Sequence, residues 1–512
     1  MVKLQLFVAA LLIGTSAEAK WYEASSDHFV VYADENPDQL RAYVEKLERF
    51  DQAMRAMRLI PNKKEGPASR VTIYRFGDVE DVRKLHGRGR SVAGFYIPRA
   101  EGSVAFVPRS ANSITISSNY ILFHEYAHDF MLRNWTGAAF PAWFVEGFAE
   151  FHATAQFRSD GSIVFGAPPT HRSYNIGNAA GLPLKELLSA RASDLQGDRQ
   201  DTLYGRGWLL THYLTFEPER RRQLAAYIGA VNSGKSSDEA AATLDGVTDA
   251  ALNAYGRRPR LNSIQIRPDQ IKMGPIKVRA LSDGEAATMP ARIRSQRGVD
   301  ESKAREVVAL ARQLAAPFPT DAAAQAGLAE AEFDAGNYKA AEAAALRATT
   351  ADPESVAGLV YLGKARIALV EADKTKDAKV WASARAPLLR ANKIDSEDPE
   401  PLIEFYDSFA AAGQSPTANA RDALLYAYAL APHDFGLRMK AGIVLLEMDK
   451  PAAARTALTP LIYTLDRGEN AISMASVLQT LAAEGSSAAL KKLRDAQSEA
   501  KKKAEEDGSD GR

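Results

Sequence analysis

The pattern of apolar and polar positions divides the chain into a mixed first half and a helical second half. In the first half, several short stretches alternate apolar and polar residues, as half-buried strands do. One longer stretch instead repeats apolar residues at helical spacing. Two of the strands flank a turn that begins with Pro98, which is typical of a β-hairpin. The predicted strands are residues 27–32, 71–74, 92–97 and 103–107, and the predicted helix is residues 40–57.

Helical patterns dominate from residue 182 to residue 255, and a first folded unit is therefore predicted over residues 20–256. Residues 257–300 are rich in Arg, Pro and β-branched residues and show no helical period, so we interpret them as a connector with a few short strands. The composition then shifts to Ala-rich helices. The resulting fold class is α+β, with a small mixed sheet and helices, followed by an all-α array.

The Ala-rich region contains a pattern over residues 321–353 that resembles the 34-residue tetratricopeptide repeat (TPR). Its discriminating positions are Gly336, Tyr338 and Pro353, because Ala matches are common in such a composition. Looser copies follow. Since helix pairs of this kind bury their apolar faces only by stacking, we expect one TPR-like solenoid over residues 301–465, with a protein partner on its concave face. A C-terminal helical segment (466–490) and a charged, disordered tail (491–512) should complete the chain.

The N-terminus predicts the compartment. Residues 1–19 have a short basic start, an apolar stretch and a small-residue cleavage site, which together predict a secretory signal peptide. No later segment is apolar for long enough to span a bilayer, so we expect no integral membrane segment after cleavage. The chain has no Cys, and export without disulfides fits a bacterial periplasm best, with secretion as an alternative. The 64 basic and 64 acidic residues balance, which does not suggest nucleic acid as a partner.

One short motif carries candidate chemistry. His124 and His128 are four residues apart, so on a helix both imidazoles can bind one metal ion, with Glu125 beside them. Glu146, on a second predicted helix, would complete three protein ligands and leave a fourth position for water. That arrangement is typical of a catalytic zinc site, in which Glu125 accepts the proton of the water. We therefore expect one Zn²⁺ per chain.

These residues resemble the gluzincin metallopeptidases, and more narrowly the peptidase-MA-like domains of bacterial envelope proteins. In those families a His-Glu-x-x-His helix precedes a helix with Glu-Gly-x-Ala, whose Glu is the third zinc ligand; here it is Glu146. The loop before Glu146 is one residue shorter than in the aminopeptidase-like gluzincins. The resemblance implies a zincin-like catalytic domain in which an edge strand of the sheet pairs with extended substrate. Phe95 and Tyr96 would then line the cleft, unless they pack in the core.

The resemblance also implies supporting residues. Glu150 matches the acid that many gluzincins use to orient a zinc-bound imidazole, and Asp129 is a weaker candidate for that role. Tyr204 is the first candidate for the donor that stabilises the oxyanion, with His212 and Tyr213 as alternatives. Each aromatic residue has a competing interpretation as a core residue.

The sequence thus predicts an exported zinc metallopeptidase that hydrolyses peptide bonds with Glu125 as general base, while the repeats recruit a protein partner. One alternative is a weakly active or inactive peptidase-fold protein that acts as an envelope scaffold through its repeats. Another is a scaffold in which zinc is only structural. The intact Glu125 favours the enzyme. Residues 20–256 are expected to fold and to bind zinc without the repeats.

Overall fold

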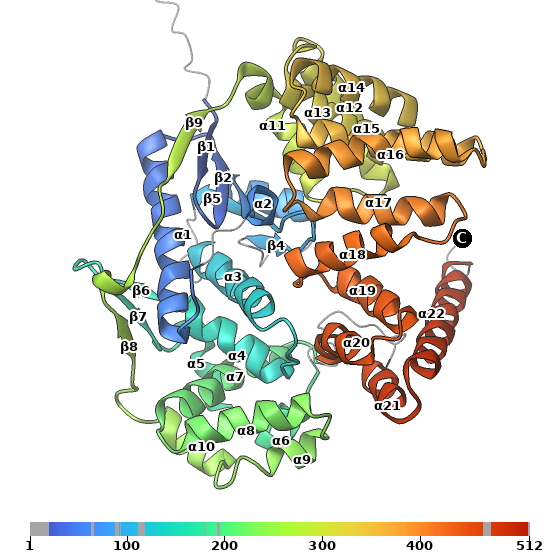
Figure 1. Cartoon of the computed structure of the whole chain (residues 1–512). Helices are drawn as coiled ribbons and strands as arrows, with labels where there is room; N and C mark the ends of the chain where they lie inside the picture. The colour runs from blue at the N-terminus through green and yellow to red at the C-terminus, as the bar shows by residue number, and fades with distance from the viewer. Residues whose placement is uncertain are drawn as a thin grey trace, which may run out of the picture.

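The computed structural model describes residues 20–62, 66–87, 92, 94–110, 118–178, 180–191, 195–463 and 473–509. Two parts lie side by side: a mixed α/β part and a helical array that begins at α11 and curves along one side of it (Figure 1). The predicted signal peptide lies outside the described residues. Within the described residues, no helix is both long and apolar enough to cross a membrane.

The first part is built on a six-stranded mixed sheet with the order β4-β5-β3-β2-β1-β9. Strands β2, β3 and β5 are parallel neighbours, whereas β4, β1 and β9 join antiparallel. The predicted hairpin is confirmed: β4 pairs with β5, with Phe95 opposite Phe106, and β4 forms one edge of the sheet. The strands are β1 Tyr22–Ser25, β2 Phe29–Ala33, β3 Val71–Asp78, β4 Phe95–Ile97, β5 Val104–Ser110 and β9 Lys277–Ala280.

Helices cover one face of this sheet and form the largest core. The helix predicted at residues 40–57 is α1 (Pro37–Arg58), whose apolar stripe packs on Val31 and Ile73 of the sheet. Asn36 caps its first turn by accepting backbone N–H groups, and Pro37 occupies a position that suits proline. Helices α3 (Ser118–Asn134) and α4 (Ala142–Ala153) share this core with α7 (Asp198–Phe216).

The remaining elements of the first part are short. They are η1 Pro67–Ser69, α2 Val79–His86, β6 Gln156–Phe157, β7 Ile163–Phe165, η2 Thr170–Arg172, α5 Ser173–Gly177, α6 Leu184–Ser189, α8 Arg220–Asn232, α9 Ser237–Ala241 and α10 Asp249–Gly256.

The short strands predicted for residues 257–300 are present, but they are not a separate connector, because they complete sheets of the first part. Strand β8 (Ile264–Ile266) pairs with β7 in a three-stranded sheet, and β9 forms the edge of the main sheet beside β1. Residues 268–270 form the short helix η4 (Pro268–Gln270). A helix that the apolar pattern did not indicate, α11 (Asp283–Gln296), follows β9 and contains Pro290. The boundary predicted at residue 256 is therefore too early.

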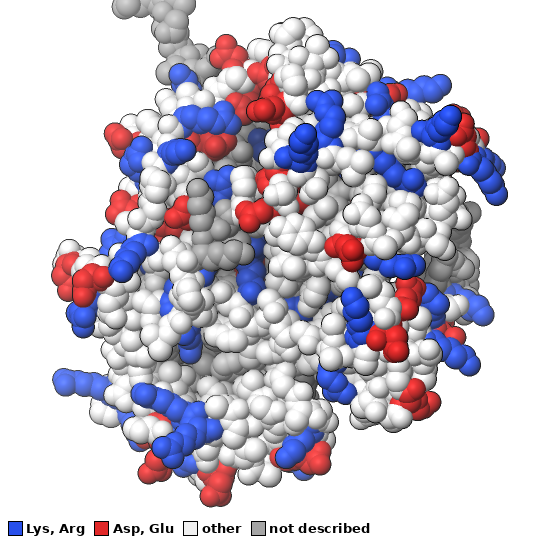
Figure 2. Space-filling view, in the orientation of Figure 1, with Lys and Arg blue, Asp and Glu red and all other residues white. Residues whose placement is uncertain are grey.

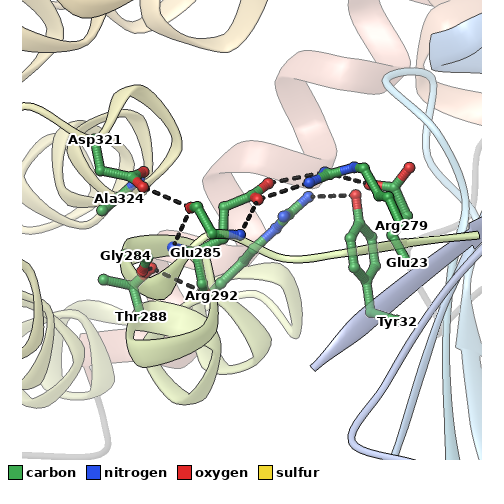
Figure 3. Close-up of polar contacts among 10 residues, drawn as sticks. Glu23, Tyr32, Arg279, Gly284, Glu285, Thr288, Arg292, Asp321 and Ala324 are labelled. Atoms are coloured by element: carbon green, nitrogen blue, oxygen red, sulfur yellow. Dashed lines mark hydrogen bonds and ion pairs between the residues drawn. The ribbon is translucent and has the colours of Figure 1, made fainter. Parts of the chain in front are cut away.

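Helix α11 forms because Ser282 and Glu285 make a reciprocal capping box at its start. It covers the second face of the main sheet, where Met289 and Ile293 pack with Tyr74 and Phe106. Figure 3 shows the polar side of this junction: Arg279 donates to Glu23 and Glu285 (2.6 and 2.7 Å), and Arg292 donates to the Tyr32 hydroxyl (3.3 Å).

The second part is a stack of antiparallel helix pairs, which confirms the predicted all-α solenoid. It starts one helix earlier than predicted, since α11 packs against α12 and α13. The pattern at residues 321–353 corresponds to one pair, with Gly336 at positive φ (74°) in its turn and Tyr338 starting the second helix. The helices are α12 Glu301–Ala315, α13 Ala322–Asp334, α14 Tyr338–Ala351, α15 Val356–Ala372, α16 Ala378–Ile394, α17 Pro399–Ala411, α18 Ala418–Leu430, α19 Phe435–Glu447 and α20 Pro451–Leu458.

The C-terminus also differs from the prediction. After η5 (Thr459–Tyr463), α21 (Met474–Glu484) belongs to the predicted C-terminal helical segment, but α22 (Ser486–Ser509) runs through most of the expected disordered tail. The physical reason lies in its first turns, where Ala489 and Leu493 are buried against Leu445 and Leu458. A helix that is nucleated by such packing can continue into a Lys-, Glu- and Ala-rich segment, because these residues are good helix formers.

The surface agrees with the balanced charge. Figure 2 shows basic and acidic side chains interspersed over the face in view. Such a surface does not attract a polyanion over a long range.

Candidate metal centre

Helix α3 presents two imidazoles to one point. His124 and His128 lie one turn apart, and their Nε2 atoms are 3.1 Å from each other. Both side chains are shielded from solvent, since His124 is buried and the His128 side chain is 16% exposed. The structure thus brings the two predicted histidines together.

Helix α4 returns after a short loop and places Glu146 opposite them. Its Oε2 atom lies 3.3 Å from Nε2 of His124 and 3.6 Å from Nε2 of His128. Ligands that bind Zn²⁺ tetrahedrally at about 2.0–2.1 Å are roughly 3.3–3.4 Å apart, so these three atoms have the spacing of a zinc site. Oε2 of Glu146 makes no hydrogen bond despite its burial, which is costly without a cation. We call His124, His128 and Glu146 the metal cluster.

A close helix contact positions Glu146. Gly147, the next residue, faces the backbone of α7, where an added Cβ would lie 2.2 Å from the carbonyl oxygen of Gly207. Gly207 in turn lies so close to Trp143 that a Cβ there would be 2.5 Å from its carbonyl oxygen. Only glycine at these two positions allows α4 and α7 to approach in this way. The Gly of the Glu-Gly-x-Ala motif therefore has a packing role.

Glu150 lies one turn after Glu146, on the far side of His124. Its Oε1 atom is 3.7 Å from Nδ1 of His124, which is the ring nitrogen that faces away from the metal cluster. The Glu150 carboxylate is fully buried and is held by the Tyr120 hydroxyl and by Nε of Arg172 (3.4 Å). Arg172 also donates to Asp201 (2.5 Å). Glu150 can therefore orient the His124 imidazole.

Asp129, the weaker candidate for that role, has other partners. Its carboxylate accepts hydrogen bonds from the Tyr96 hydroxyl (2.8 Å) and from Nε of Arg133 (2.7 Å). Helix geometry explains this outcome, because Asp129 is one residue beyond His128 and its side chain leaves the helix about 100° away from the cluster. It connects α3 to β4 instead.

Tyr204 lies at the site, whereas its two alternatives do not. Its ring stacks beside His124 at 5.8 Å between centroids, and the Arg172 guanidinium lies over its other face at 4.7 Å. His212 is in the core, hydrogen-bonded to the Tyr255 hydroxyl (2.7 Å). Tyr213 is also buried there and packs on Tyr255. Both residues follow Tyr204 by more than two helical turns and contact Tyr255 instead.

A cavity of about 310 Å³ opens in front of the metal cluster. It includes His171, a residue that the sequence analysis missed. Nε2 of His171 is buried without a hydrogen-bond partner, and its ring packs edge-on against Tyr120. The sequence could have indicated Tyr120, since it precedes His124 by one helical turn. No spacing in the sequence indicates His171 and Arg172, which only the folded chain brings to the site. The lining residues are Tyr120, Ile121, His124, Glu125, His171, Arg172, Gln200, Asp201 and Tyr204.

The electrostatics of the site favour a cation. Burial by itself would lower the pKa of His124, but the carboxylates of Glu146, Glu150 and Glu125 outweigh it and raise that pKa to about 9. Burial would likewise raise the pKa of Glu146, yet the two imidazoles hold it at about 2. The charge of Glu146, followed by burial, raises the pKa of Tyr204 far above its ordinary value, so the phenol keeps its proton.

A second buried cluster is already satisfied by protein groups. His28 Nδ1 lies 2.9 Å from Glu48 and 3.5 Å from Asp51. Asp51 also accepts from Arg55 (2.7 Å) and from the Tyr126 hydroxyl (2.7 Å). With an arginine already bound to its carboxylate, this cluster is a structural ion network that ties α1 to β2 and α3.

Comparisons with known proteins give only weak likenesses. No protein-family model matches the chain, and no curated protein matches it. Among solved structures, a TPR protein from Thermus thermophilus is similar over 39% of this chain and 99% of that one, with a TM-score of 0.30 and 16% identity. A tetratricopeptide repeat protein from Parabacteroides merdae is similar over 54% and 92%, with a TM-score of 0.27 and 13% identity. At these scores the likeness adds nothing to what the helix pairs show, and it says nothing about the metal cluster.

Proposed function

We propose that this protein is an exported, zinc-dependent metallopeptidase. The observation that carries the proposal is the metal cluster, in which two imidazoles and one carboxylate have tetrahedral spacing, next to a cavity lined by His124 and Glu125. Three protein ligands beside a cavity leave a position for water or substrate, which separates catalytic from structural zinc. A bound zinc ion would lower the pKa of water and polarise a carbonyl group.

The side chains around the cluster have distinct tasks. Glu125 borders the cavity beside the ligands, where its carboxylate can accept a proton from water and pass it to the leaving amine. Tyr204 keeps its phenol proton and can donate it in a hydrogen bond to the oxyanion of the transition state. Glu150, held by Tyr120 and Arg172, lies 3.7 Å from Nδ1 of His124, and we assign it the task of orienting that imidazole.

The proposed substrate is a peptide in extended conformation. Strand β4 is the edge of the main sheet, so the side that does not face β5 can pair with an added strand. Tyr96 of β4 bonds to Asp129, the neighbour of His128, so this edge lies next to the metal helix. Phe95 packs on Phe106 and His86, so its ring is part of the small core and not of the cavity.

The test uses the purified full chain. We expect about one zinc per chain by elemental analysis and hydrolysis of a peptide library. Glu125→Gln keeps the shape of the side chain but removes its basicity, so zinc should stay while turnover falls by roughly 10²-fold or more. Glu301→Gln, with an exposed side chain far from the cavity, is the matched control. Equal turnover of Glu125→Gln and wild type, or full zinc content in a His124→Ala/His128→Ala variant, would refute the proposal.

A second candidate function is a protein-binding scaffold that uses the helical array. The array that starts at α11 favours this candidate, since stacked helix pairs commonly hold protein segments on their inner face. Zinc binding without hydrolysis of any peptide, together with capture of a defined partner by the array, would support the scaffold over the enzyme. The absence of both zinc and hydrolysis would also favour it.

A further inference from the structure

One edge of the array, where α18 ends and α19 begins, is occupied by a segment of the same chain. The turn between β4 and β5 (residues 98–102, the β4–β5 turn) leaves the edge of the sheet and enters the array. Ala100 is 4% exposed and packs on Leu402 of α17 and on Leu424 and Ala427 of α18. Figure 1 shows β4 on the side of the sheet that faces these two helices.

The array recognises the backbone of this turn. The N–H of Ala100 donates to Oδ2 of Asp434 (3.1 Å), and the carbonyl oxygen of Arg99 lies 2.9 Å from Nε2 of His433. Asp434 uses its other oxygen to cap α19. The Arg99 guanidinium donates to the carbonyl oxygen of Gln296 at the end of α11 (2.6 Å). The turn is thus held both at the first helix of the array and near α19.

The contact between the turn and the array also involves α3, the helix that carries His124 and His128. Nη2 of Arg133 in α3 is 3.4 Å from Nε2 of His433, and Nε of Arg133 donates to Asp129. Asp129 accepts from Tyr96 of β4, which leads back to the turn. A closed ring of polar contacts therefore joins β4, α3 and the array. Asp129 and His433 are almost completely buried, so their hydrogen bonds within this ring are shielded from water.

We propose that this edge of the array is a built-in receptor for the β4–β5 turn, and that the contact holds β4 in place beside α3 while its free edge stays open to an added strand. The array then sets the position of β4 relative to the metal cluster, and with it the geometry in which an extended peptide would bind. A protein partner that binds this edge of the array has to displace the turn, and it would release β4 by doing so. The expected change in peptide turnover rests on the proposed function, whereas the expected displacement of the β4–β5 turn does not.

The experiment measures backbone hydrogen exchange of residues 94–103 and the rate of tryptic cleavage after Arg99 in the full chain. Asp434→Asn removes the charge that accepts the Ala100 N–H but can still cap α19. Ala100→Glu places a carboxylate among apolar side chains and opposes the docked turn. The matched control is Asp300→Asn, which changes another N-cap aspartate that accepts from Lys303 N–H and lies on α12. We expect both rates to rise at least tenfold in the two turn variants and to stay at the wild-type value in the control.

Zinc content should not change in these variants, while turnover of extended peptides should fall. Unchanged exchange of residues 94–103 in Asp434→Asn and in Ala100→Glu would overturn the receptor contact. Faster exchange with unchanged turnover would overturn its link to substrate geometry. If Ala100→Glu unfolds the array, as exchange in α13–α16 would reveal, Asp434→Asn decides. A wild-type protein without peptidase activity would refute the proposed function alone, because exchange is measured without substrate.

Discussion

At the scale of single residues, His124 is the side chain on which the site converges. Its Nε2 faces Glu146 and His128, its Nδ1 faces Glu150, and its ring stacks beside Tyr204. Of these contacts, only the one between His124 and His128 is a spacing along one helix; the residues of α4 and α7 were expected at the site from the motif and the family resemblance. The ring orientation, which decides which nitrogen meets the metal, follows from the fold.

The raised pKa of His124 predicts the pH dependence of metal binding. Without metal, three carboxylates keep a proton on this imidazole up to a pKa of about 9. Metal binding has to displace that proton, so the apparent zinc affinity should rise roughly tenfold per pH unit between pH 6 and pH 8.5. Chelator competition across this range measures the slope. An affinity that does not depend on pH would show that the neutral imidazole is already the resting form.

A second prediction at the residue scale tests whether Tyr204 or His171 donates the hydrogen bond to the oxyanion. Tyr204→Phe removes the phenol next to His124, so turnover should fall by roughly 10²-fold while zinc content stays constant. Tyr213→Phe makes the same change on the same helix, but in the core, and is the matched control. The parallel variant is His171→Phe, which removes the unpartnered nitrogen of the cavity and should have the smaller effect. A larger loss in His171→Phe would transfer the donor role to that residue.

At the scale of elements, the site depends on how closely α4 and α7 approach. The sequence predicted both helices and the ligand Glu146, but it did not show that Gly147 and Gly207 are the contact between them. Since an added Cβ at Gly147 would meet backbone atoms, which cannot move independently of their helix, the contact cannot relax cheaply.

We therefore predict that Gly147→Ala destabilises the protein by about 2 kcal/mol or more, through overpacking, and lowers zinc retention by displacing Glu146. Gly229→Ala is the control, because Gly229 lies in α8 with open space around its Cβ direction. There, alanine should be neutral or stabilise by roughly 0.5–1 kcal/mol. Chemical denaturation and elemental analysis of both variants provide the measurement. Similar unfolding free energies for the two variants would contradict the close contact.

At the scale of the whole molecule, residues 257–298 unite the two parts. Strands β8 and β9 complete two sheets of the first part, and α11 covers the second face of the main sheet while it starts the array. Arg292 adds a cation–π contact at 4.5 Å from the Tyr32 ring centre, at the junction drawn in Figure 3. The first part and the array are thus not independent modules.

This arrangement changes the expectation that a truncated chain of residues 20–256 folds and binds zinc. A chain of residues 20–256 lacks β8, β9 and α11, so it leaves sheet edges and apolar residues such as Tyr74 and Phe106 uncovered. We predict that it aggregates or fails to hold zinc. A chain of residues 20–298 retains all three elements and should be more soluble and bind zinc. Circular dichroism, gel filtration and elemental analysis distinguish the two. A stable, zinc-loaded 20–256 chain would contradict the extended boundary.

The sequence by itself determined what local periodicity and spacing encode. The β4–β5 hairpin, the helix α1, the helix pair at residues 321–353 and the order of the elements follow from alternation and helical repeats over short ranges. The spacing of His124 and His128 likewise implies a shared helix face, since both residues lie on one continuous helix.

Only the tertiary structure decided how distant segments meet. No local pattern indicates the pairing of β9 with β1, the closeness of His171 and Arg172 to the metal cluster, or the docking of Ala100 against the array. The capping box at Ser282 marks the start of α11, but the packing of this helix on the main sheet was decided by the fold. In each case the stabilising partner lies far away in the sequence. Burial against such partners, and not local propensity, sets the conformation of these segments, because most of the stability of a short helix or edge strand comes from packing.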